Sequence, residues 1–192
     1  DWSGLEVLDC EGKYVLPAWC DSHTHLVFAA SRSGEFLSRL EGKSYQEIAA
    51  EGGGILNSAR ALRSMSEADL FADARKRLLQ AIHSGTGSIE IKSGYGLDAE
   101  AELKMLRVIR ALKEDFSIPI KATFLACHAV PKGNWTAQSW TKHIVEKVLP
   151  MVVQEGLADY VDAFCEKGYF GLEETQLLLD AASAIGIGLK YM

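Results

Sequence analysis

The sequence predicts an α/β fold built on a parallel sheet, and three observations support this. Short apolar segments of strand length alternate with longer helical patterns along the chain. Several strand segments are nearly continuous apolar runs, as expected where both faces of a parallel sheet are covered. Polar residues follow the strands, at the end where parallel α/β folds bind ligands. Either a doubly wound sheet or a (β/α)₈ barrel fits.

Five strands are predicted, too few for a complete eight-stranded barrel, which takes about 250 residues. A barrel fold would therefore be incomplete here, with about five βα units. The predicted strands cover residues 16–20, 85–92, 120–127, 160–165 and 188–192.

The helices are predicted from apolar stripes and from capping residues. Ser66 can cap a helix over residues 66–82, because Asp69 follows three positions later. Pro119 ends a helix over residues 98–116, and Pro150 is expected to kink or divide a helix over residues 136–155. A last helix is predicted over residues 172–184, with Gly186 as its C-cap.

Composition narrows the class of protein. The chain has 192 residues, of which 48% are hydrophobic, and a net charge of −6. This suits one globular domain or a large part of one. Basic residues are scattered, so no nucleic-acid partner is expected, and no apolar run approaches a membrane span. Four cysteines without a Cys-x-x-Cys pair suggest reduced thiols and a cytoplasmic location.

The most informative motif is His23-Thr24-His25, at the end of the first predicted strand. Alternate residues of a strand face the same side, so both imidazoles can reach one divalent ion. Asp21 is predicted on the same face. The spacing alone leaves two interpretations open, a metal site or a chance pair at an exposed strand end.

Other polar residues follow the later strands. Tyr95 stands between two glycines, where it can contact a ligand or pack over a rim. His128 can bind a substrate carbonyl, transfer a proton or be a half-buried packing residue. Arg32, in a predicted loop, can clamp a carboxylate or pair with Glu35. Lys92 is interpreted as the ion-pair partner of Glu90 rather than as a metal bridge.

With these residues identified, the chain resembles the imidazolonepropionase family of the amidohydrolase superfamily. The His-x-His motif is shared by the superfamily, whereas the segment around Tyr95 and the Arg32 loop are more specific. The matching segments, in family order, are residues 16–29, Ser31-Arg32, Glu35-Phe36, Gly52-Gly53-Gly54-Ile55, Lys92-Ser93-Gly94-Tyr95-Gly96-Leu97, Thr123-Phe124, His128-Ala129-Val130-Pro131 and Gly188-Leu189-Lys190.

The resemblance implies a distorted (β/α)₈ barrel that carries a small β-sandwich. Residues 1–15 would be a remnant of the sandwich, and residues 16–192 the N-terminal and central part of the barrel. By the same resemblance, the chain is expected to be truncated at both ends.

The implied reaction is hydrolysis of the cyclic amide 4-imidazolone-5-propanoate to N-formimidoyl-L-glutamate, a step of histidine degradation. By similarity, His23 and His25 hold one zinc or iron ion, Arg32 binds the carboxylate of a small anionic substrate, and Tyr95 and His128 contact that substrate. His128 is the candidate catalytic residue. A homodimer is compatible with this interpretation.

One departure from the family pattern bears on the metal. The family has a third histidine ligand where this chain has Met192, and a thioether suits zinc poorly. Two alternatives are therefore kept. The alternatives to an imidazolonepropionase are a non-catalytic fragment or binding module without a complete metal site, and part of another cyclic amidohydrolase.

Overall fold

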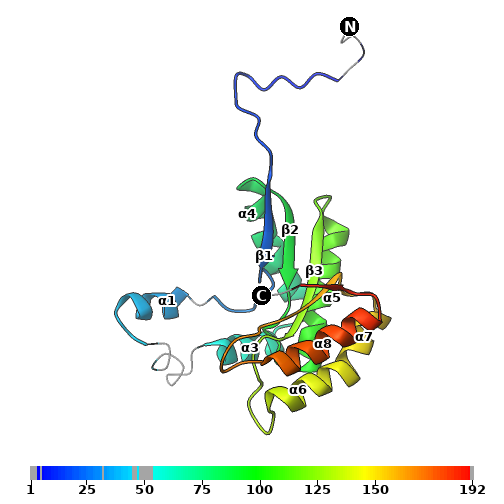
Figure 1. Cartoon of the computed structure of the whole chain (residues 1–192). Coiled ribbons are helices and arrows are strands. Elements are labelled where there is room, and N and C mark those ends of the chain that lie inside the picture. Colours follow the sequence, from blue (N-terminus) through cyan, green and yellow to red (C-terminus); the bar gives the residue numbers. More distant parts are fainter. Residues whose placement is uncertain (1–3, 5, 32, 45–46, 48–53, 191–192) are drawn as a thin grey trace.

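The computed structural model describes residues 4, 6–31, 33–44, 47 and 54–190, and its centre is a five-stranded parallel sheet (Figure 1). The mixed α/β class predicted from the sequence is confirmed. The strands are β1 (Trp19–Thr24), β2 (Thr86–Lys92), β3 (Ile120–Cys127), β4 (Tyr160–Ala163) and β5 (Gly188–Leu189).

The strand order favours one of the two architectures that the sequence left open. The strands pair in the order β1-β2-β3-β4-β5, and every pair is parallel. A doubly wound sheet reverses its order at a switch point, whereas a barrel adds strands in sequence. Right-handed crossovers in this order place all connecting helices on one side of the sheet. The topology is therefore consistent with part of a (β/α)₈ barrel.

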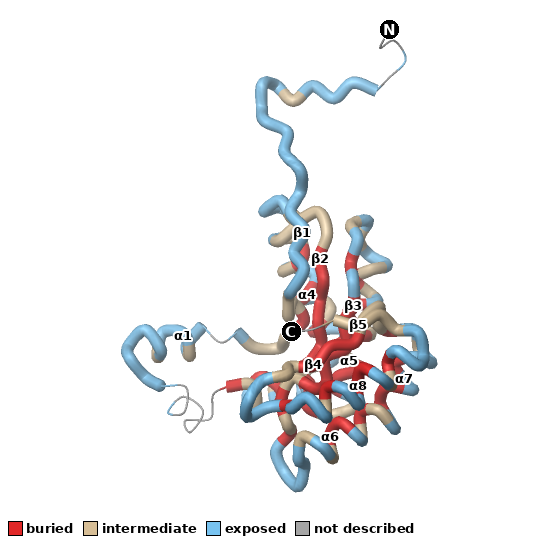
Figure 2. Tube along the Cα trace, viewed as in Figure 1, coloured by how far each residue is buried: buried red, intermediate tan, exposed pale blue. Residues whose placement is uncertain are grey.

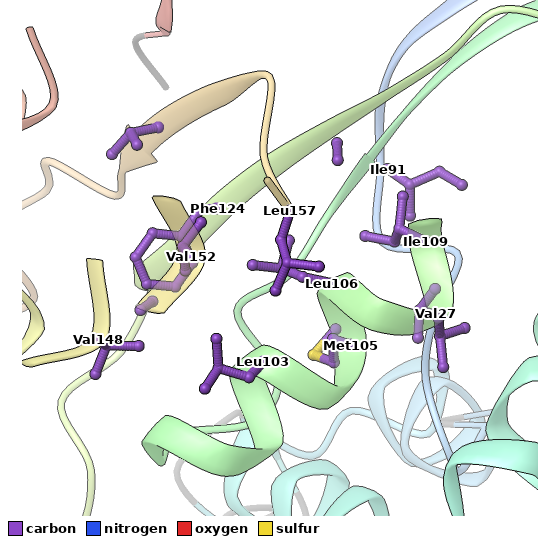
Figure 3. Close-up of a cluster of buried hydrophobic side chains, with 14 of the residues drawn as sticks. Val27, Ile91, Leu103, Met105, Leu106, Ile109, Phe124, Val148, Val152 and Leu157 are labelled. Atoms are coloured by element: carbon purple, nitrogen blue, oxygen red, sulfur yellow. The ribbon is translucent and has the colours of Figure 1, made fainter. Parts of the chain in front are cut away.

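The apolar core lies between the sheet and its helices. Alternate strand residues such as Ile91 and Phe124 share one buried cluster with helical residues such as Leu106 and Ile109. Figure 3 shows these side chains converging, with α5 at the centre of the view. The helices are α1 (Ser33–Leu40), α3 (Ile55–Ser64), α4 (Glu67–His83), α5 (Ala99–Asp115), α6 (Ala137–His143), the π-helical turn η1 (Ile144–Val148), α7 (Leu149–Gln154) and α8 (Leu172–Ala184).

Helices α4 and α5 match their predicted ranges to within a residue at each end. The Ser66 hydroxyl accepts a hydrogen bond from the amide of Asp69 at 3.1 Å, which is the predicted cap of α4. The Asp98 carboxylate caps α5 in the same way, accepting from the amide of Ala101 at 2.8 Å. Each cap satisfies an amide that the first helical turn leaves free.

The helical region around Pro150, predicted to be kinked or divided, consists of three consecutive helical segments. A π-helical turn joins α6 to α7, and the amide of Leu149 donates to the carbonyl of Ile144, five residues earlier. Pro150 falls in the first turn of α7, directly after this wider turn. The wider turn thus accommodates the proline within a continuous helical run.

The first strand starts later than predicted, and the loop after it is partly helical. β1 covers Trp19–Thr24 rather than residues 16–20, so His23 lies within the strand. Its pairing with β2 is irregular between Asp21 and Thr24. Residues 33–35, expected in a loop, begin the short helix α1. Apolar content located β1 but not its ends, which depend on pairing with β2, and it did not indicate α1.

The described residues before β1 lie away from the sheet. Residues 6–18 form no strand, and Val7, Leu8 and Tyr14 are 85–95% exposed. Figure 2 shows this segment as an exposed extension beyond the buried body. A β-sandwich remnant at residues 1–15 therefore stays a prediction, as does the boundary that separates it from residues 16–192.

Candidate functional site

Four of the predicted site residues come together at the carboxyl end of the sheet. His23 and His25 come from β1 and its end, Tyr95 from the loop after β2, and His128 from the residue after β3. The His25 ring centroid lies 5.7 Å from His23, 4.7 Å from Tyr95 and 4.9 Å from His128. His25 thus contacts all three rings, and the Tyr95 and His128 centroids are themselves 5.6 Å apart, so the rings of His25, Tyr95 and His128 form a triangle.

The imidazole of His25 is neutral at neutral pH, and one of its nitrogens has no partner in the part of the chain that the structure describes. The pKa of His25 is lowered from 6.5 to about 3, mainly by burial and also by the nearby charges of His128, His23 and Lys92. A hydrogen bond with the backbone of Ser93 opposes this shift. Its Nδ1 is buried and has no hydrogen-bond partner among the described residues. A neutral imidazole with a buried unpaired nitrogen has the chemistry of a metal ligand.

His128 is oriented by the loop that carries Tyr95. Its Nδ1 lies 3.1 Å from the carbonyl oxygen of Gly94, which can only accept, so Nδ1 carries the proton in this hydrogen bond. Burial lowers the pKa of His128, which favours the neutral ring. The neutral tautomer with Nδ1–H leaves the Nε2 lone pair free to accept a proton or a hydrogen bond.

A buried network of ion pairs lies beside the histidines, on the face of the sheet that points away from the helices. Lys92 Nζ lies 2.6 Å from Asp162 and 3.2 Å from Glu90, and all three side chains are at most 3% exposed. Lys190 Nζ lies 2.5 Å from Glu90, which also accepts a hydrogen bond from Thr123. The predicted Glu90–Lys92 pair is confirmed, and two carboxylates balance two ammonium groups.

A small cavity opens next to the central histidine. It has a volume of about 200 Å³ and is lined by six residues. This is below the roughly 300–1,000 Å³ of pockets for drug-sized ligands, so it suits a small molecule. Arg32 directly follows one of the lining residues in the sequence. The lining residues are His25, Phe28, Ala30, Ser31, Ser58 and Tyr95.

Two predicted positions lie outside the described residues, Arg32 and the third-ligand position Met192. Over the described part of the chain, no group of three or more histidine, cysteine, aspartate or glutamate side chains is placed to hold a metal. The predicted metal donors that the structure describes are two imidazoles, whereas catalytic zinc usually has three protein ligands. The site roles predicted for His23, His25, Tyr95, His128 and Arg32 stay predictions.

Several residues around the site were not found from the sequence. Asp162 joins the ion-pair network from β4, and a lone aspartate within an apolar strand was the signal for it. Arg77 of α4 donates to the Leu26 carbonyl at 3.1 Å and covers the Phe28 ring, which holds the segment after His25. Glu102 of α5 binds the loop around Tyr95. Its position in a helical pattern carried no signal of this contact.

Comparison with known proteins tests the family resemblance. The chain is 50% identical to the imidazolonepropionase of Christiangramia forsetii over 186 residues, 51% identical to that of Flavobacterium johnsoniae over 187, and 47% identical to that of Desulfotalea psychrophila over 187. The resemblance to imidazolonepropionases is confirmed. The matches cover 96–97% of this chain but 44–45% of the relatives, so the chain spans less than half of their length. No family model matches the chain.

The chain is therefore a homologue of enzymes over one part of their sequence. No described helix of the chain is both long and apolar enough to cross a membrane.

Proposed function

We propose that the protein to which this chain belongs is an imidazolonepropionase, which hydrolyses 4-imidazolone-5-propanoate to N-formimidoyl-L-glutamate in histidine degradation. One observation carries the proposal: His23, His25, Tyr95 and His128, singled out from the sequence, converge beside a small cavity. The similarity to proteins named imidazolonepropionase supports the substrate class. The reaction adds water across a ring C–N bond of the cyclic amide.

His23 and His25 would hold one divalent ion, zinc or iron. The buried, unpaired Nδ1 of His25 and the low pKa of its ring fit this role, because a ligand imidazole must be neutral. The ion, when bound, supplies Lewis acidity and lowers the pKa of a coordinated water toward 7. With two imidazoles placed among the described residues, the remaining ligands must come from elsewhere in the protein.

His128 would take the proton-transfer role. Its Nδ1–H donates to the Gly94 carbonyl, so the Nε2 lone pair remains as an acceptor. The lowered pKa keeps this lone pair available near neutral pH. After accepting a proton, the same nitrogen can donate to the substrate carbonyl or to the departing ring nitrogen.

Tyr95 and Arg32 would bind the substrate. The Tyr95 ring lines the cavity beside His25 and can contact a planar imidazolone ring. Arg32 would pair with the propionate carboxylate, since a guanidinium binds carboxylates bidentately. The proposal includes a cytoplasmic enzyme with a small anionic substrate, without a nucleic-acid partner or membrane attachment, that forms a homodimer.

The experiment measures metal content and turnover together. The whole protein is purified as wild type, His25→Ala and His83→Ala, the last replacing an exposed histidine of α4. For the wild type and His83→Ala, we expect about one zinc or iron ion per chain and hydrolysis of imidazolonepropionate. His25→Ala should lose both the metal and turnover. Metal-free, inactive wild type would support the binding-module alternative, and turnover of other cyclic amides alone would support a different amidohydrolase.

A further inference from the structure

Glu102 is a buried carboxylate in the first turn of α5, and its side chain accepts hydrogen bonds from a loop. The residue is 0% exposed. Its Oε2 accepts from the amide of Gly94 at 2.8 Å, and its Oε1 accepts from the amides of Gly96 and Leu97 at 2.8 and 3.1 Å. Burial raises its pKa, and the hydrogen bonds from the loop oppose that shift. Both oxygens are therefore used as acceptors.

The two glycines that flank Tyr95 let this loop pass close to α5 and to His128. A Cβ on Gly96 would lie 2.6 Å from the amide nitrogen of Glu102. A Cβ on Gly94, which has a φ of +108°, would lie 2.9 Å from the Leu125 carbonyl oxygen and 3.0 Å from the His128 ring. The loop is thus packed between the start of α5 and His128.

These contacts lead directly to the functional side chains. Gly94 donates its amide to Glu102 and accepts from His128 Nδ1 through its carbonyl. Tyr95 lies between the two anchored glycines and stacks on His25 at 4.7 Å. One carboxylate therefore sets the backbone that orients the tyrosine ring and holds the histidine tautomer.

We propose that Glu102 is the positioning residue of this site, which fixes the Tyr95 ring and the Nδ1–H tautomer of His128 through the loop of residues 93–97. The inference rests on the proposed function for its catalytic consequence. Glu102 itself is separated from the substrate cavity by the loop, and it acts through hydrogen bonds alone.

The test is Glu102→Gln in the whole protein. An amide places an NH₂ donor where one carboxylate oxygen now accepts, so at least one loop amide loses its acceptor. We expect hydrogen exchange at the Gly94, Gly96 or Leu97 amides to rise at least tenfold, and the His128 ring ¹⁵N shifts to move toward a tautomer mixture. KM for imidazolonepropionate should rise roughly tenfold or more, because the misplaced loop positions the substrate poorly. Metal content should stay at the wild-type value.

The matched control is Glu100→Gln, which makes the same chemical change two residues away on a side chain that is 76% exposed. It should leave exchange, ring shifts and KM at wild-type values. Ser93→Ala is a milder variant, because the Ser93 hydroxyl is a further hydrogen-bond partner of Glu102. It should shift the same signals less, and it serves if Glu102→Gln does not fold.

The outcomes separate this inference from the proposed function. Wild-type loop exchange, ring shifts and KM in both Glu102→Gln and Ser93→Ala would overturn the positioning role, whatever the substrate. Changed exchange and ring shifts in a protein whose wild type does not turn over imidazolonepropionate would support the positioning role and reject the proposed function.

Discussion

Both faces of the sheet contain fully buried residues, but these residues are stabilised by different interactions. On the face toward the helices, Ile89 and Ile91 are at most 3% exposed and touch apolar side chains. On the opposite face, Glu90, Lys92 and Asp162 are also at most 3% exposed, but they are charged and paired. Apolar burial is favourable by itself, whereas a buried charge is tolerated only with its partner. The burial of a residue alone therefore does not measure its contribution to the free energy of unfolding.

The charged face is also the one that adjoins the candidate site. The charge of Lys92 lowers the pKa of His25 and of His128, while that of Asp162 raises the pKa of His128. The sheet thus has one face that holds the fold together and one whose interactions bear on chemistry. Three substitutions or conditions test this difference, from the largest expected effect to the smallest.

Lys92→Met should be the most destabilising change. The substitution removes the cation nearest to the buried Asp162 and one of the two cations paired with Glu90. The free energy of unfolding should therefore fall by about 3–5 kcal/mol. Urea denaturation measures this loss. Lys76→Met is the control, because its pair with Asp73 is exposed, and it should cost about 0.5 kcal/mol or less. An equal decrease in the free energy of unfolding in both variants would contradict the distinction between buried and exposed ion pairs.

Leu106→Ala tests the apolar face. Leu106 is 0% exposed within the core cluster, so its truncation should cost about 2–5 kcal/mol through lost burial and a new cavity. Leu37→Ala on α1, where the side chain is 58% exposed, should change stability by about 0.5 kcal/mol or less. Thermal unfolding of both variants distinguishes the two sites, and a loss under about 1 kcal/mol at Leu106 would mean that this face packs loosely.

The pH dependence of stability tests the histidines beside the charged face. The folded-state pKa of His25, about 3, lies below the ordinary 6.5, and that of His128 is also lowered. Between these pKa values the unfolded chain binds more protons than the folded chain. The contribution of the neutral histidines to the free energy of unfolding is therefore fully present above pH 6.5 and is lost as the pH falls toward 3. With a chelator present, His25 should account for about 2–3 kcal/mol between pH 7 and pH 4.

His25→Gln should flatten that slope, whereas His83→Gln, at an exposed position, should keep it. Denaturation midpoints at a series of pH values give the comparison. An unchanged slope in His25→Gln would show that this ring is solvated and is not the buried neutral imidazole described above.

Much of the architecture could be predicted from local pattern. The side chains of Ser66 and Asp98 each accept a hydrogen bond from an amide three residues later. Because such contacts and the apolar stripes are local, nearby sequence was enough to place α4 and α5. The end of β1 was misplaced because strand pairing with β2, far along the chain, determines which residues are in the sheet. The π-helical turn before Pro150 likewise depends on how the long helical region packs, and no local pattern indicated it.

The candidate site shows the same division. His23, His25, Tyr95 and His128 could be found because each follows a predicted strand, and parallel strands end at one edge. Glu102 and Arg77 could not be found, because each reaches a loop from within an amphipathic helix, where charged residues are normally solvated.

By itself, the sequence determined the α/β class, the approximate elements and the residues with ligand chemistry, because periodicity, capping and the polar ends of strands are local properties. Only the tertiary structure decided the sequential strand order, the pairing of Lys92 with Asp162 and the contact of Glu102 with the Tyr95 loop. These features join residues that are distant along the chain, or residues whose burial depends on what packs over them, and local sequence carries no record of either.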